Sequence, residues 1–286
     1  MLKHTFLHIP RIGYRTEEKL WSKGFESWQD YLERCHLCDL SSLQPQFVLR
    51  YLNDSRQALA RNDARHFEES LPSGECWRLY GDFRDKVAFV DIETTGLYPG
   101  EDSITVIGLF DGDSAKAFVK GINLEDFVEE VKKYSLLVTF NGKRFDLPFI
   151  RGVFGDFPPR QGHLDVMFAL RRFGYRGGLK SIEVQLGLER EGALKQVDGY
   201  VAVLLWKEYR RGNKAALDTL IRYNLEDVVN LQYLADIVYN MGTAQLPIKV
   251  EPLPKPKKYL LDNPFDPELV EYLNDRIREE QIWRQF

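Results

Sequence analysis

The sequence lacks the cysteine content and the long apolar runs that mark two large classes of protein. Its three cysteines, Cys35, Cys38 and Cys76, are an odd number, which argues against a disulfide framework. The longest apolar run covers residues 200–206 and is far shorter than the roughly 18 to 20 residues of a membrane span. The first residues also lack the apolar core of a signal peptide. We therefore expect reduced thiols, no membrane partner and a cytoplasmic location.

A strong excess of either charge is also missing, because 39 Lys and Arg residues oppose 43 Asp and Glu residues and leave a formal net charge of −4. Such a chain has no global positive field, so local clusters or bound metal would have to hold any nucleic-acid partner. Hydrophobic residues make up 44% of the 286 residues, which is enough for a sizeable core. Collagen-like, coiled-coil and disordered classes are excluded.

Shifts in composition predict three parts of the chain. Residues 1–82 indicate a helical domain rich in Arg, Glu and Gln, and residues 83–243 carry β-rich runs followed by helices. Residues 244–286 combine a linker, in which four prolines prevent helix formation, with a C-terminal helix from Pro267 to Phe286.

The alternation of apolar residues predicts an α/β fold for the middle part. Three short β-rich runs separated by Gly and Asp turns indicate antiparallel strands. An amphipathic helix at 124–134 and a buried strand at 136–140 indicate a crossover, which adds parallel strands to form a mixed sheet flanked by helices. The expected antiparallel strands cover residues 87–93, 104–111 and 115–120, and the later helices cover residues 164–173, 179–188, 200–211 and 214–239.

Two carboxylates end the first expected strand, in the segment Asp91-Ile-Glu93. Because side chains alternate across a strand, both point to the same face, about 6.6 Å apart along the chain. The following turn, Thr94-Thr95-Gly96, places them at the carboxyl edge of the sheet, where α/β folds tend to bind ligands. A solvated strand end is the alternative.

Further acids stand at Asp146, where a helix is expected to begin, and at Asp227, one turn after Tyr223 in the long helix. Helix capping is the alternative for Asp146, and a surface position is the alternative for Asp227.

Carboxylates brought together repel one another by about 4 kcal/mol at about 4 Å and an effective dielectric constant of about 20. Divalent cations remove this penalty. Oxygen ligands favour Mg²⁺ or Mn²⁺, and two such ions support displacement at phosphorus, which is nuclease chemistry.

Three segments in this order resemble the exonuclease motifs of the DEDD superfamily: Asp91-Ile-Glu93-Thr-Thr-Gly, Asn141-Gly-Lys-Arg-Phe-Asp146 and Tyr223-Asn-Leu-Glu-Asp227. The resemblance covers residues 87–241. It is strongest to the RNase H-like predicted exonucleases of the YprB-like family and to the proofreading domains of family B DNA polymerases. It implies an RNase H-like fold and 3′-to-5′ exonuclease activity.

The resemblance also implies roles for individual residues. Asp91, Glu93 and Asp227 would bind one metal ion, Asp91 would help to hold a second, and Asp146 would complete the set. Tyr223 marks the tyrosine subclass, because the position of the alternative histidine holds Arg222, and its hydroxyl would orient the attacking water. Substrate contacts are implied for Thr94, Thr95, Gly96, Leu97, Asn141, Phe145 and Lys180.

Other residues near these motifs are expected to have structural roles or to contact phosphates. We expect Asp165 to cap a helix and His163 to be structural. Lys180, with Arg171, Arg172 and Arg176, either lines the path of a phosphate backbone or forms a solvated basic face.

Residues 9–28 resemble a helix-hairpin-helix motif, with a short helix capped by Gly24 and a second helix beginning at Ser27. In that family a Gly-rich hairpin donates backbone N–H groups to a phosphate, but Arg11 stands here in place of the first glycine. Phosphate binding and a purely structural helical pair both remain open. The Cys35 and Cys38 pair, with Cys76, is expected to pack rather than to bind zinc or an iron–sulfur cluster.

These features predict a metal-dependent 3′-to-5′ exonuclease that acts on single-stranded DNA or RNA, with DNA favoured, and uses two Mg²⁺ or Mn²⁺ ions. A DNA-repair or helicase partner could dock on the N-terminal or C-terminal helices. An endonuclease on the same fold and a non-catalytic nucleic-acid-binding adaptor are the alternatives. The complete set of acids argues against the adaptor.

Overall fold

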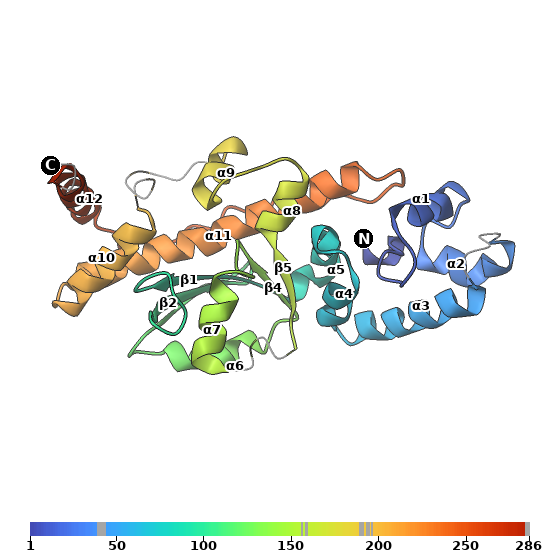
Figure 1. Ribbon diagram of the computed structural model, residues 1–286, viewed down its shortest axis with the longest axis horizontal. Coiled ribbons are helices and arrows are strands. Elements are labelled where there is room, and N and C mark those ends of the chain that lie inside the picture. Colours follow the sequence, from blue (N-terminus) through green and yellow to red (C-terminus); the bar gives the residue numbers. More distant parts are fainter. Residues whose placement is uncertain are drawn as a thin grey trace.

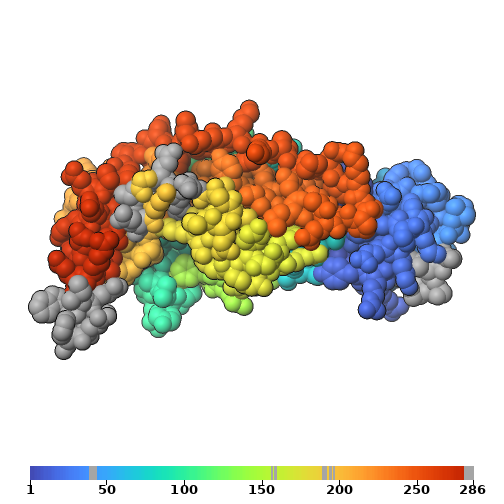
Figure 2. Space-filling model, turned by 90° about the horizontal axis from the view of Figure 1, so that it is seen from above, coloured from blue at the N-terminus to red at the C-terminus, as the bar shows by residue number. Residues whose placement is uncertain are grey.

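The computed structural model describes residues 1–38, 44–155, 157, 160–188, 192, 195 and 197–283. The molecule is elongated, with the N-terminal helices at one end and α12 (Pro267–Trp283) at the other (Figures 1 and 2). Residues 284–286 of the expected C-terminal helix lie outside the described residues. In the described part of the chain, no helix combines the length and apolar character that a membrane span needs.

A five-stranded mixed sheet forms the centre, in the order β3-β2-β1-β4-β5. The first three strands are antiparallel neighbours, and β4 and β5 are added in parallel. This topology confirms the predicted α/β fold with a mixed sheet. The strands are β1 (Val87–Thr94), β2 (Ile104–Phe110), β3 (Ala115–Val119), β4 (Leu136–Thr139) and β5 (Gly162–Asp165).

The sequence predicts a helix from residue 164, but residues 164 and 165 belong to the strand β5. The expected start of the helix was therefore two residues too early. The helix α8 (Val166–Arg172) begins only after the strand. With four residues, all buried, β5 is too short to show an alternation of apolar and polar residues. Only its pairing with β4 identifies it as a strand.

The two faces of the sheet are covered by different helices (Figure 1). On β1, Phe89 shares a core with Val228 and Leu231 of α11, whereas Val90 and Ile92 pack with the helices α6 and α7. The 31-residue helix α11 runs across the sheet for about 46 Å at about 1.5 Å per residue. These and the neighbouring helices are α6 (Phe127–Val131), α7 (Asp146–Phe154), α9 (Leu179–Gln185), α10 (Gly199–Arg210) and α11 (Lys214–Ala244).

The N-terminal part has the helical pair that the sequence predicts. Gly24, with φ of +83°, follows α1, and Ser27 caps α2 in a capping box with Asp30. Arg11 has φ of +70°, a left-handed conformation that glycine adopts at lower cost. The helices are α1 (Tyr14–Ser22), α2 (Trp28–Arg34), α3 (Pro45–Ala60), α4 (Ala64–Ser70) and α5 (Tyr80–Phe83).

The apolar core is continuous between the N-terminal helices and the sheet, because one cluster holds residues from both. Gly242 of α11 lies under Trp77, and a Cβ atom at this glycine would come within 2.6 Å of the indole ring. Gly81 lies under Tyr239 in the same way. The two glycines therefore allow aromatic rings to join α11 to the N-terminal part, and the division at residues 82 and 83 remains a prediction.

A buried ionic network crosses the same boundary. The Arg78 guanidinium, almost fully buried, lies 3.0 Å from the Glu17 carboxylate of α1 and 2.7 Å from the Glu75 carboxylate. Arg172 of α8 contacts the second oxygen of Glu75. The negative charges of the two acids are therefore balanced by the positive charges of the two arginines, and the network connects α1 to α8.

Candidate active site

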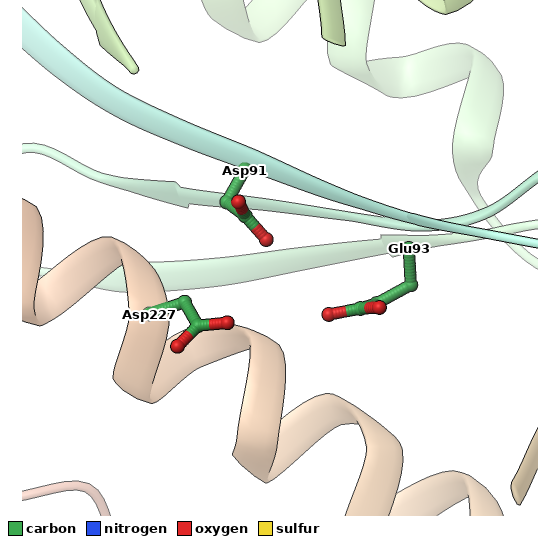
Figure 3. A group of neighbouring side chains, drawn as sticks. All are labelled: Asp91, Glu93 and Asp227. Atoms are coloured by element: carbon green, nitrogen blue, oxygen red, sulfur yellow. The ribbon is translucent and has the colours of Figure 1, made fainter. Parts of the chain in front are cut away.

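Three carboxylates from two elements converge between the sheet and α11. Asp91 and Glu93 leave β1 on the face that meets α11, and Asp227 points from α11 toward them (Figure 3). One oxygen from each carboxylate lies within 4.8 Å of the other two. Glu93 and Asp227 are buried, and Asp91 is half-buried. In the described ranges, this is the one group of three or more Asp, Glu, His or Cys side chains with this spacing.

The close approach of β1 and α11 depends on a glycine and an asparagine. Gly108 of β2 is the partner of Asp91 in the sheet, and a Cβ atom there would lie 2.2 Å from the Asn224 side-chain oxygen. Asn224 is fully buried, and its Nδ2 donates to the Asp91 carboxylate at 3.0 Å and to its backbone oxygen at 3.3 Å. Asn224 was not among the predicted site residues. Its position three residues before Asp227, on the same helix face, was the available signal.

Burial and mutual repulsion perturb the acids. Burial raises the pKa of Glu93 well above its usual range, and the negative charge of Asp227 raises it further. Burial also raises the pKa of Asp146 to about 7, with contributions from the charges of Asp165 and Asp227. Both shifts have the direction expected when dehydrated carboxylates are held close together. A divalent cation relieves the cost of this arrangement, so this set of oxygen ligands fits Mg²⁺ or Mn²⁺.

Asp146 is close to the cluster without belonging to it. It is the first residue of α7 and is 2% exposed, and the charge of Asp227 affects its pKa. The three-carboxylate group does not include it. The alternative role as a helix cap is not observed, because Phe145 is the N-cap and no side-chain capping hydrogen bond is present.

A cleft of about 570 Å³ opens beside the acids. It contains six of the seven residues predicted to bind substrate, namely Thr94, Thr95, Gly96, Leu97, Phe145 and Lys180. Asn141, the seventh, does not line it. A wall of α10, formed by Gly199, Tyr200, Val203 and Lys207, was not predicted. No local motif marks this wall, because it depends on how α10 folds back over the sheet.

Tyr223 stands in the cleft wall, one turn before Asp227. Its side chain is largely buried, and the Lys180 ammonium lies 5.0 Å from the centre of its ring. This cation–π contact places a positive charge beside the acids.

The loop after β1 is held in shape by Asp102. Its carboxylate accepts hydrogen bonds from the Thr95 hydroxyl at 3.1 Å and from the Tyr98 backbone at 3.0 Å. Gly96 passes so close to Asp102 that a Cβ atom would clash with the carboxylate. Leu97 is consequently presented to solvent at the cleft margin, with 71% of its surface exposed.

Asp165 caps α8, as expected, by accepting a hydrogen bond from the Met167 backbone. It also accepts from the backbone N–H groups of Asn141 at 2.9 Å and Lys143 at 3.1 Å, so it fixes the loop that leads to Asp146. His163 is buried in β5, with Nε2 2.9 Å from the Thr139 hydroxyl. It lies outside the acid cluster, in agreement with a structural role.

Comparisons with known proteins identify the family of this chain and solved structures that are similar to it. Residues 88–239 match the family model described as the RNase_H superfamily, whereas no curated protein matches the chain. A solved nuclease in its apo form is 21% identical, with a TM-score of 0.39 over 54% of this chain and 72% of that chain. The family B DNA polymerase of the archaeon Pyrobaculum calidifontis is 17% identical, with a TM-score of 0.40 over 55% of this chain and 26% of the polymerase. Brucella melitensis NrnC with bound Mg²⁺ is 21% identical, with a TM-score of 0.31 over 60% and 93% of the two chains.

The matched residues begin in β1 and end in the second half of α11. They contain all of the five-stranded sheet except Val87, the first residue of β1, and all three clustered carboxylates. Since they amount to more than half of the chain, the protein belongs to the RNase H superfamily and its α/β fold is RNase H-like.

Proposed function

We propose that the protein is a metal-dependent 3′-to-5′ exonuclease of the DEDD tyrosine subclass, which hydrolyses single-stranded nucleic acid, with DNA favoured, by a two-metal-ion mechanism. The observation that carries the proposal is the convergence of Asp91, Glu93 and Asp227 beside an open cleft. The 3′ polarity and the subclass rest on the resemblance of the three sequence motifs to those of the DEDD exonucleases.

The carboxylates of Asp91, Glu93 and Asp227 would hold one Mg²⁺ or Mn²⁺ ion, and Asp91 with Asp146 would serve a second. Bound cations would neutralise the carboxylates and polarise the scissile phosphodiester. Asn224 orients the Asp91 carboxylate through its hydrogen bond, so this ligand is preorganised.

The remaining residues of the cleft would position the substrate. The Tyr223 hydroxyl would orient the attacking water, since burial and the neighbouring Lys180 restrict its ring. Leu97 and Phe145, which both line the cleft, would contact the terminal nucleotide, and Lys180 would attract its phosphate.

A time course with 5′-labelled single-stranded DNA and RNA in Mg²⁺, Mn²⁺ or EDTA tests the proposal. We expect a metal-dependent ladder that shortens from the 3′ end in the wild type. The variant Asp91→Asn should show no ladder, because it keeps the shape of the side chain but loses the charged ligand. Asp113→Asn, in the exposed turn between β2 and β3, is the matched control and should cleave normally.

Other outcomes point to the alternatives. Internal cuts in circular DNA would replace the exonuclease with an endonuclease on the same fold. Binding without cleavage of either nucleic acid would favour the adaptor. A DNA-repair or helicase partner at the N-terminal or C-terminal helices remains a separate proposal.

A further inference from the structure

A group of arginines lies outside the cleft and is oriented by an aromatic ring. The guanidinium carbons of Arg144 and Arg171 lie 5.5 Å and 5.8 Å from the centre of the Phe168 ring. Stacking on a ring restricts a guanidinium while its N–H donors stay available. We call Arg144, Phe168 and Arg171, with the adjacent Arg176, the arginine surface.

Within the part of the chain that the structure describes, no acid forms an ion pair with the arginines of this surface. Among the described residues, neither Arg144 nor Arg171 forms an ion pair or a side-chain hydrogen bond, and Arg176 donates only to backbone carbonyls. The adjacent Arg172, by contrast, is paired with buried Glu75. Lys143 is close in sequence but shares a small hollow with Glu68, so we leave it out of the surface.

The arginine surface borders the cleft on one side. Arg144 directly precedes Phe145, which lines the cleft. The loop that carries Arg144 is bound through the Asn141 and Lys143 backbones to Asp165, the cap of α8. Since α8 carries Phe168 and Arg171, the loop and the helix hold the three side chains in one rigid unit.

On its other side the surface approaches the N-terminal hairpin. Arg172, which follows Arg171, lies 5.9 Å from the ring centre of Tyr14, the first residue of α1. In Figure 2 the yellow residues of α8 and α9 lie on the same side of the molecule as the blue N-terminal residues. The arginine surface therefore lies between the cleft margin and the N-terminal hairpin, with the paired Arg172 on its hairpin side.

We propose that a single strand of nucleic acid whose terminal nucleotides occupy the cleft continues across the arginine surface, where its phosphates pair with Arg144 and Arg171. The proposal rests on the proposed function, since it names where the rest of that substrate lies. Arginine contacts to phosphates supply affinity without sequence information. Long strands therefore bind more tightly than short ones, although the chain as a whole carries a net charge of −4.

Binding of labelled oligothymidylates in EDTA, followed by fluorescence anisotropy at several salt concentrations, tests this surface in the full chain. The double variant Arg144→Gln/Arg171→Gln should bind a 20-mer about tenfold more weakly, and the slope of log K against log salt should fall by about 1.4, at about 0.7 per lost phosphate contact. Affinity for a dinucleotide, the short probe, should stay within about twofold. Arg144→Lys/Arg171→Lys should retain most of the salt slope.

The matched control is Arg61→Gln/Arg160→Gln. These exposed arginines also lack ion pairs among the described residues, but they line a basic groove with Ser135 and Gln161, at the starts of β4 and β5 and thus at the opposite edge of the sheet. The control should bind the 20-mer like the wild type. Equal losses in the two double variants, unchanged binding in Arg144→Gln/Arg171→Gln, or no binding by the wild type would each overturn the proposal.

Hydrolysis separates this proposal from the proposed function. Binding in EDTA does not require catalysis, so a protein that shows the expected length dependence and never cleaves would contradict the exonuclease alone. If instead Arg144→Gln/Arg171→Gln folds normally by circular dichroism and cleaves both lengths at the wild-type rate, with unchanged binding, only the arginine surface is rejected.

Discussion

At the scale of single residues, Asn224 shows how one buried amide organises the acid cluster. Its Nδ2 is shared between the carboxylate and the backbone oxygen of Asp91, so it joins α11 to β1 at the centre of the site. A hydrogen bond to a charged group contributes more than one between neutral groups. Asn224 therefore acts through Asp91, as a positioning residue.

Replacement of Asn224 with alanine should lower kcat on single-stranded DNA by about 10- to 100-fold, because a bond to a charged partner contributes about 1.5 to 3 kcal/mol. The apparent affinity for Mn²⁺, measured by calorimetry, should fall as well. Asn230→Ala removes an amide from the same helix, where it binds Glu183, and should leave kcat within about twofold. Wild-type kcat and Mn²⁺ affinity in Asn224→Ala would exclude the positioning role.

His8 makes the stability of the protein sensitive to acid. It is 3% exposed and packs against Trp28 and Phe67, and neither ring nitrogen has a hydrogen-bond partner among the described residues. Burial, with a smaller effect of His66, lowers its pKa to about 3. Above pH 6.5 the His8 side chain is neutral in both the folded and the unfolded state. As the pH falls below 6.5 the unfolded state gains the proton first, so stability drops by about 1.4 kcal/mol per pH unit.

The variant His8→Phe should lose less stability between pH 7.5 and pH 5.0 than the wild type, by about 2 kcal/mol in the free energy of unfolding. Urea denaturation at pH 7.5, 6.0 and 5.0 measures this difference. The exposed His36 provides the control, and His36→Asn should follow the wild-type profile. Parallel profiles for His8→Phe and the wild type would show that His8 is not the source of acid sensitivity.

At the scale of elements, the packing of α11 on β2 determines whether the acids can meet. Gly108→Ala would place a methyl group 2.2 Å from the Asn224 oxygen and 3.2 Å from Val228, so α11 must move away from the sheet. We expect a loss of about 1 to 3 kcal/mol in stability and a fall in kcat, since Asp227 moves with the helix. Urea denaturation and steady-state kinetics measure the two effects.

A second substitution tests the cause. In Gly108→Ala/Asn224→Ala the clash is removed, so stability should recover in part while kcat remains low. Gly152→Ala in α7 is the control, because no atom lies within 4 Å of its Cβ position, and it should be neutral or stabilising. An equal stability loss in the single and double Gly108 variants would exclude the contact with Asn224 as the cause.

The elements also show what the sequence could and could not predict. The first four strands were predicted to within two residues at each end, because their apolar runs are bounded by Gly and Asp turns. The acids of β1 and α11 could be placed on common faces by strand and helix periodicity. The strand β5 and the cleft wall of α10 were missed, because each depends on contacts between segments distant in the sequence.

At the scale of the whole molecule, the ionic network of Arg78 joins the N-terminal helices to the RNase H-like part. Arg78→Met should destabilise the protein by about 3 to 5 kcal/mol, because it leaves Glu17 and Glu75 buried with too little positive charge. Chemical denaturation gives the free energy of unfolding. Arg278→Met breaks the exposed pair with Asp275 in α12 and should change stability by less than about 1 kcal/mol. Similar small losses in both variants would contradict a structural role for the network.

The rings of Trp77 and Tyr239 pack on Gly242 and Gly81 and so join the N-terminal helices to α11. We therefore expect the N-terminal and RNase H-like parts to unfold together on heating. Because a single core extends through both parts, neither can unfold without exposing apolar surface of the other. We expect one calorimetric transition, with equal calorimetric and van't Hoff enthalpies, and Trp77→Ala should lower its midpoint without splitting it. Two resolved transitions in the wild type would show independent folding units. In the single-transition case, the RNase H-like part draws some of its heat resistance from N-terminal helices that contribute none of the three clustered carboxylates.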